Sequence, residues 1–332
     1  MAHEFETGFF VNTPAWHGLG KTVRNAPSIQ DAIVMAGLDW EVRKEPLQIA
    51  SDGRLVPDAY ASVRSTDDSI LGVVGPVWQP LQNRDAFAWF QPLVESGDVT
   101  LEAAGSLRHG QRVWMLAKAA TAEVKPGDAV EQYVLLSNGH DGKLGVRIGF
   151  TTTRVVCMNT LKVAHASDAS KLVRIQHSSK TTVLLENLRE LMDVCNAEFR
   201  ATTEQLKALA GTRCTERDLR RYVRDVFSLP EPKLVTKPSA DAMWGAALPE
   251  CDPTSTSVNK TESKVVELFE MGRGAELSRG TMWGAYNAVT EFLTHKKGKD
   301  PGTRLNNQWF SKEASLINRA LDLAVGRAAV GA

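Results

Sequence analysis

Alternating apolar and polar positions run through the first quarter of the chain, interrupted by short turn-forming sequences. This alternation predicts strands, because successive side chains of a strand point to opposite faces. Three strands are expected here: a first formed by residues 40–44 and 47–49 together, a second at 60–64 and a third at 70–74. Before them, Ser28 is a favourable N-cap and Gly37 a favourable C′ residue, so a helix is expected over 28–37. The segment is interpreted as a helix followed by a three-stranded antiparallel meander.

The pattern then changes to helical spacing and returns to strands. Asn83 is expected to cap a helix whose apolar face includes Phe87, Phe90, Leu93 and Val94. The strands expected after it are residues 99–104, 112–117, 132–136, 146–150 and 154–157. A further helix is expected to begin at Asn159 and to reach Ala166.

From Thr181 onward the apolar positions repeat with the period of a helix. The positions that share one face are Leu184, Leu188, Leu191, Cys195 and Phe199. A second helix should begin after Thr215, which has Asp218 at the N3 position of a capping pair. Later helices are expected at 261–272, 280–294 and 311–325. The pattern therefore predicts an α+β fold, with an antiparallel sheet and flanking helices followed by a helical C-terminal part.

These elements divide the chain into five parts. The expected parts are an N-terminal arm (1–27), an α+β core domain (28–180), a helical segment (181–228), a linker or long loop rich in Pro, Ser and Thr (229–260) and the C-terminal helices (261–332). The arm should be mostly irregular. Its Trp16 has two open interpretations, a plug at the edge of the core or a contact to a second subunit or a ligand.

Composition restricts the class of protein. The 332 residues are 43% hydrophobic and 23% charged with a net charge of zero, which is typical of a soluble globular protein. No apolar run approaches the ~18 residues of a membrane span, and the N-terminus lacks the basic start of a secretory signal. The four cysteines are scattered without a C-x-x-C pair, so reduced thiols in a cytoplasmic protein are expected, with no disulfide and no membrane partner.

Charge is uneven along this neutral chain. Residues 133–180 contain seven lysines and arginines against two aspartates. Basic side chains among Ser, Thr and Asn suit phosphate contacts, and Thr151, Thr152 and Thr153 could also donate to phosphates. The residues expected to bind nucleic acid are Lys143, Arg147, Arg154, Asn159, Lys162, Lys171, Arg174 and Lys180. The alternative is a solvated basic surface that acids elsewhere offset.

Signatures of catalysis are weak in this sequence. Leu144 follows Lys143 where a phosphate-binding loop requires Ser or Thr. Cys157 with His165 could suggest a thiol nucleophile, but a buried structural cysteine is the favoured interpretation. The histidines lack the spacing of metal ligands. No enzymatic activity, cofactor or metal is therefore expected.

Several short fragments together resemble the phage/plasmid-like protein family, a domain family of unknown function found on mobile elements. The fragments are Trp16–Gly20, Gln79–Asn83, Ser137–Gly142, Arg154–Leu161 and Thr281–Ala288. This resemblance implies no activity or catalytic residues. A looser resemblance concerns residues 28–160, where a helix, a Gly37-to-Trp40 step and a strand meander are similar to the core of Rad52-like single-strand annealing proteins. That resemblance implies rings or filaments with a basic groove for single-stranded DNA.

The resulting hypothesis is a non-enzymatic DNA-binding protein of a mobile element, which favours single-stranded DNA in recombination or annealing. Self-association into a homo-oligomer is expected, through the Trp16 arm and the sheet edges. The alternative hypothesis is an interaction or assembly protein, in which the C-terminal helices dock a partner and the basic stretch is ordinary surface.

Overall fold

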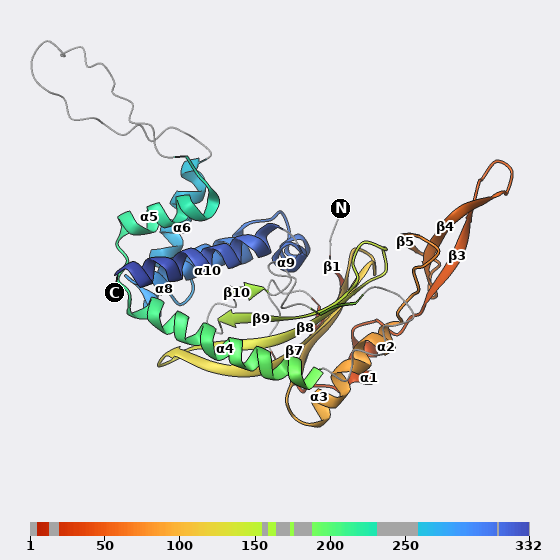
Figure 1. The fold of residues 1–332 in the computed structure, drawn as a ribbon, viewed down its shortest axis with the longest axis horizontal. Helices are drawn as coiled ribbons and strands as arrows, with labels where there is room; N and C mark the ends of the chain where they lie inside the picture. The colour runs from red at the N-terminus through yellow and green to blue at the C-terminus, as the bar shows by residue number, and fades with distance from the viewer. Residues whose placement is uncertain are drawn as a thin grey trace, which may run out of the picture.

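The computed structural model of the chain describes residues 5–12, 20–154, 159–163, 173–175, 188–230, 258–310 and 312–331. The molecule is elongated (Figure 1). A large sheet lies in the middle, a small sheet projects from one end, and a group of C-terminal helices occupies the other end. This is an α+β fold with mainly antiparallel strand pairs, as the sequence pattern predicted.

The large sheet has the strand order β10-β9-β8-β7-β6-β1-β2, and β11 also pairs with β9. Its strands are β1 (Phe5–Val11), β2 (Lys21–Val23), β6 (Thr100–Leu107), β7 (Arg112–Lys125), β8 (Asp128–Gly139), β9 (Val146–Arg154), β10 (Asn159–Val163) and β11 (Val173–Ile175). β1 and β2 are parallel, and the other neighbours pair antiparallel. The short turns between consecutive strands β6 to β9 permit this antiparallel arrangement.

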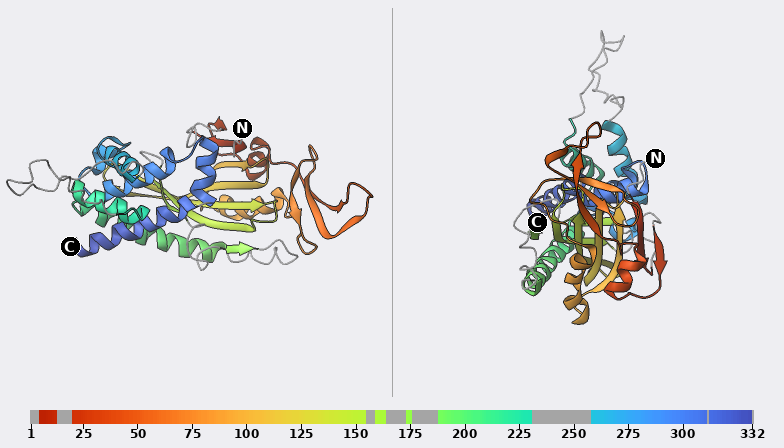
Figure 2. Two further views of the ribbon diagram at one scale, coloured as in Figure 1. Left: turned by 90° about the horizontal axis from the view of Figure 1, so that it is seen from above. Right: turned by 90° about the vertical axis from the view of Figure 1, so that its right-hand side faces the viewer.

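The small sheet is the predicted meander. It consists of β3 (Val42–Gln48), β4 (Leu55–Arg64) and β5 (Ile70–Val74), in that order. Figures 1 and 2 show this sheet projecting from the body, and it is called the β3–β5 arm below to distinguish it from the N-terminal residues 1–27. Helix α1 (Ile29–Met35) precedes it, and the Ser28 hydroxyl accepts a hydrogen bond from the backbone N–H of Asp31, which confirms the predicted N-cap.

Three short helical segments follow the β3–β5 arm instead of one long helix. They are α2 (Asn83–Phe87), the 3₁₀ turn η1 (Ala88–Phe90) and α3 (Gln91–Glu95). The expectation that Asn83 caps this region is wrong, because Gln82 occupies the N-cap position and the buried Asn83 amide bonds elsewhere. Phe87, Phe90 and Leu93 are nevertheless buried as predicted.

The C-terminal part is helical, as predicted. Its elements are α4 (Leu188–Gly211), α5 (Glu216–Phe227), α6 (Val258–Met271), α7 (Ala275–Ser278), α8 (Met282–Glu291), the π-helical turn η4 (Phe292–Lys296), α9 (Pro301–Phe310) and α10 (Lys312–Gly331). The sequence pattern did not predict α7 and α9. No helix in the described ranges is long and apolar enough to cross a membrane.

The large sheet separates two apolar cores. Along β7 and β8, alternate residues belong to opposite faces, as the two-residue period of a strand requires. One core joins α1 to α3 with Val113, Met115, Val134 and Leu136. The other joins the C-terminal helices with Trp114, Leu116, Tyr133 and Leu135. The helical half therefore shares its core with the sheet.

Two further expectations fail. The described part of residues 1–27 is not an irregular arm, because it contains β1 and β2, β1 lies between β6 and β2 in the large sheet, and Phe9, Phe10 and Val11 are buried there. The helix expected from Asn159 is also wrong, since residues 159–163 form β10 and pair with β9. Thr160 and Val163 are β-branched and suit a strand, and the hydrogen bonds of β9 stabilise that conformation.

Candidate nucleic-acid interface

Two of the sequence fragments that carried the family resemblance meet in a buried polar cluster. A ring nitrogen of His140, Nε2, lies 2.9 Å from Oδ1 of Asn83. The side-chain amide of Asn138 donates to the backbone carbonyl of Leu81 across 3.0 Å. Gln82 bonds both the backbone N–H and the carbonyl of Val42. These contacts join β8, the start of α2 and the base of the β3–β5 arm, so the two fragments hold the fold together.

The end of the large sheet gathers much of the predicted basic stretch. β10 and β11 lie one after the other along the side of β9 that β8 does not occupy. Arg174 on β11 is directly opposite Arg147 on β9. Farther along, Asn159 on β10 is opposite Arg154. Arg147 and Arg174, 27 positions apart in the sequence, thus become cross-strand neighbours.

The strand period divides these residues between two faces. Alternate residues of a strand belong to opposite faces. Arg147 and its partner position 174 therefore share one face of β9, whereas Arg154, Asn159 and Lys162 occupy positions of the other face. α10 and α8 lie close to β10 (Figure 1). The β11 end and the β10 end of β9 therefore carry these residues at positions of opposite faces.

The remaining residues of the predicted set are less closely grouped. Lys143 is exposed in the turn between β8 and β9, where Oδ1 of Asp141 accepts hydrogen bonds from the N–H groups of Lys143 and Leu144 at 2.9 and 3.2 Å. Arg147 is half-buried. Lys171 and Lys180 lie outside the described residues, as does Trp16.

The three threonines next to these residues are not available to phosphates. Thr151, Thr152 and Thr153 are all buried in β9. This corrects the expectation that their hydroxyls donate to phosphates. The cause is the sheet itself, because β8 and β10 flank this half of β9 and C-terminal helices contact β10.

A second basic surface, which is not among the residues predicted to bind nucleic acid, lies on α5. Thr215 caps this helix together with Asp218 in a complete capping box, as the sequence predicted. The apolar face of α5, with Leu219, Tyr222 and Val223, packs into the core. The opposite side carries arginines at positions 217, 220, 221 and 224. Their three- and four-residue spacing is the signal that could have identified this surface.

Two of these arginines are held by one buried carboxylate. Glu262 of α6 accepts from Nη1 of Arg220 at 2.9 Å and from Nε of Arg224 at 3.0 Å. Only 6% of the Glu262 side chain is exposed. Arg220 also contacts Glu216 at 2.6 Å. Burying one carboxylate between two guanidinium groups fixes both in position.

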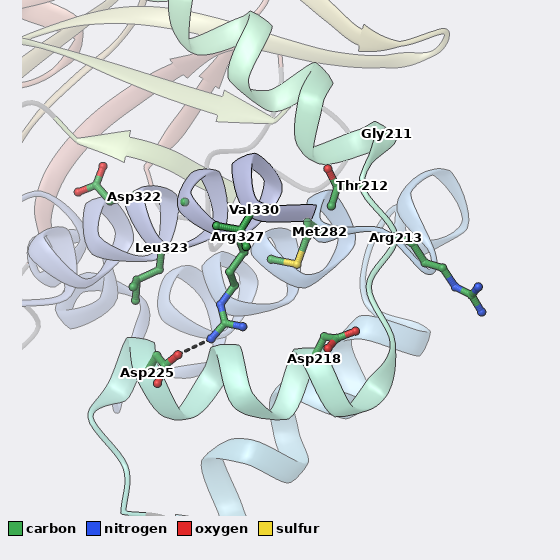
Figure 3. A pocket seen from close by; sticks show the side chains of 11 residues that line it. Gly211, Thr212, Arg213, Asp218, Asp225, Met282, Asp322, Leu323, Arg327 and Val330 are labelled. Carbon is green, nitrogen blue, oxygen red and sulfur yellow. Dashed lines mark hydrogen bonds and ion pairs between the residues drawn. The ribbon is translucent and has the colours of Figure 1, made fainter. Parts of the chain in front are cut away.

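A hollow of about 900 Å³ lies between α5, α10 and the end of α4 (Figure 3). Arg327 reaches across it from α10 to form an ion pair with Asp225 of α5. Asp218 and Asp322 bring further negative charge to the lining. Burial raises the pKa of the adjacent Cys214 thiol to about 12, so this thiol is protonated at neutral pH and is a poor nucleophile.

Other chemistry has little support in the described part of the chain. No group of three or more His, Cys, Asp or Glu side chains that could hold a metal ion occurs among the described residues. Cys195 and Cys214 are buried free thiols. The basic surfaces on β9–β11 and α5 are therefore the main candidates for a functional site.

The fold and the candidate site define an α+β protein that combines a large antiparallel sheet, a helical C-terminal part and two basic surfaces. The chain belongs to the family described as "Domain of unknown function (DUF932)", whose model matches residues 70–321. That description assigns no activity. No curated protein and no solved structure matches the chain. The looser resemblance to single-strand annealing proteins stays a prediction, although the helix, meander and helix of residues 29–87 have the expected order.

Proposed function

We propose that this protein binds DNA, single strands in preference to duplex, and acts in recombination or strand annealing for a phage- or plasmid-type element. The link to such elements rests on the sequence fragments described above. The proposed contacts are electrostatic and require no metal or nucleotide.

The observation that carries the proposal is the pairing of β11 with β9. It places Arg147 and Arg174 opposite each other on one face. Two basic residues at opposed positions of a strand pair can contribute to one stretch of phosphate backbone, because each can neutralise a phosphate. The exposed Lys143 lies in the turn that leads into the same strand. This end of the sheet is therefore the proposed starting point of the DNA path, and the β10 positions are a second contact.

Fluorescence anisotropy with a labelled oligothymidine and a duplex of equal length tests the proposal. Four or five neutralised phosphates should give a log–log salt slope of roughly −3 for the single strand. The single strand should bind more tightly than the duplex at each salt concentration. Absence of binding at low salt, or tighter binding to the duplex, would contradict the proposed preference.

The β3–β5 arm favours a second candidate function, which is assembly with a protein partner. The side chains of Ile70 and Val73 on its outer strand β5 are 66% and 62% exposed, and Val77, three residues after the strand, is 77% exposed. Exposed apolar side chains on an edge strand are typical of protein contacts. Sedimentation of the chain at micromolar concentration distinguishes self-assembly from a monomer that binds DNA.

A further inference from the structure

The side of α5 that faces away from the core contains a small basic hollow. About 570 Å³ of space is lined by Glu216, Arg217, Arg220, Arg221 and Arg224. Arginine suits phosphate because its planar guanidinium group presents donors in a fork that matches phosphate oxygens. The hollow is separate from the sheet end that carries the proposed DNA contacts, since α5 belongs to the C-terminal helices.

The charges in this hollow do not cancel. Arg220 and Arg224 share Glu262, and Arg220 also contacts Glu216. Four guanidinium groups therefore face the carboxylates of Glu216 and Glu262, and the nearby Asp218, whose pKa Arg221 helps to lower, offsets a third charge, which leaves one positive charge. Arg217 and Arg221 are exposed and form no ion pair within the described part of the chain. They are four residues apart, so they lie next to each other on the helix surface.

The hollow is also rigid beneath these two arginines. The Thr215 cap fixes the start of α5, with the Thr215 hydroxyl 2.6 Å from Oδ2 of Asp218. The buried Glu262 fixes Arg220 and Arg224. A surface whose shape is set before the ligand arrives loses less conformational entropy on binding. Adjacent like charges on a helix also repel, and an anion between them would relieve that repulsion.

We infer that the arginine hollow of α5 is a second phosphate site, which holds the backbone of the same DNA strand through Arg217 and Arg221. The inference rests on the proposed DNA binding and adds the C-terminal helices to the DNA path. Binding here reads no sequence, because guanidinium contacts to phosphate carry no base information.

The test compares two double variants in anisotropy measurements with a labelled oligothymidine. R217A/R221A removes the two exposed arginines of the hollow. The control, K21A/R24A, removes two exposed positive charges on and after β2. Loss of two phosphate contacts should flatten the salt slope by about 1.4 and weaken binding roughly 20-fold at 0.1 M salt. The control should keep the parent slope, and circular dichroism should show that both variants fold.

The other possible results would each contradict the α5 site, the proposed function or both. If the parent binds and R217A/R221A binds equally well, the α5 site is refuted while the proposed function stands. If both double variants weaken binding equally, the effect is one of net charge and the site is again refuted. If polyglutamate binds the parent and binds R217A/R221A less tightly, while both bind the oligothymidine equally, the hollow takes acidic protein instead. If the parent does not bind, the proposed function and this inference fail together.

Discussion

The indole nitrogen of Trp283 donates a hydrogen bond of 2.8 Å to Oδ2 of Asp128, a residue 155 positions earlier in the chain. Both side chains are fully buried. The contact joins the first turn of α8 to the first residue of β8. Trp283 stands in one of the fragments that carried the family resemblance, and its bond joins the C-terminal helices to the sheet.

Replacing Trp283 by Phe should lower the free energy of unfolding by about 1.5–3 kcal/mol beyond the effect of ring size, because a hydrogen bond to a buried charged group is lost. Urea unfolding measures this difference. Trp89→Phe is the control, since Trp89 is also buried but has no described hydrogen bond from its indole. Equal losses in the two variants would show that the Asp128 bond adds nothing.

The cap of α5 should make its contribution depend on pH. Hydrogen bonds from the Thr215 hydroxyl and backbone hold the pKa of Asp218 below its usual 3.8. Because the pKa of Asp218 is lower in the folded protein than in the unfolded chain, the stability that the Asp218 carboxylate contributes is present above about pH 4. It is lost as the pH falls through the folded pKa. Thr215→Ala should therefore cost about 1 kcal/mol at pH 7, and less near pH 2. A cost that is the same at both pH values would contradict this coupling.

Gly72 on β5 leaves no room for a side chain. A Cβ atom there would lie 2.7 Å from the Cα of Asp141. Gly72→Ala should therefore destabilise the protein by about 1–3 kcal/mol through overpacking. Gly75→Ala is the matched control, because nothing lies within 4 Å of a Cβ at that position. Thermal unfolding of the two variants should separate clearly, and coincident curves would show that β5 can move away from the turn.

Three residues at the β9–β11 end of the large sheet should each contribute to DNA binding: Arg147, Arg154 and Lys162. The triple variant R147A/R154A/K162A should flatten the log–log salt slope for a single strand by about 2, since about three phosphate contacts are lost. Anisotropy titrations at several salt concentrations give this slope. R147A alone should account for about a third of the change on the same reasoning. A triple variant that binds like the parent would assign the sheet end to ordinary surface.

Self-association should involve the edge strand β5 of the β3–β5 arm. Ile70→Lys with Val73→Lys places charge on the exposed edge strand and should shift the sedimentation profile toward smaller species. Val330→Lys is the control, because Val330 is 89% exposed but lies at the end of α10. A parent chain that sediments as a clean monomer at micromolar concentration would exclude the oligomeric form of the proposal.

Local sequence signals determined much of this fold. Ser28 and Thr215 begin their helices as the capping rules predict, because an N-cap bonds an N–H group only three residues away. The alternation in residues 60–64 and 70–74 predicted two strands of the meander for the same reason, since it reports a local period. The long helix around Cys195 and Phe199 followed from its apolar face.

Only the tertiary structure decided which residues meet and which are covered. Residues 159–163 are a strand because β9 supplies hydrogen bonds from outside the segment, and five residues are too few for their period to distinguish helix from strand. Thr151 is buried by neighbouring strands and helices that its own sequence does not encode. Arg224 is fixed by Glu262, 38 positions away on another helix. Charge can be counted along a sequence, but its exposure and its partners depend on long-range packing.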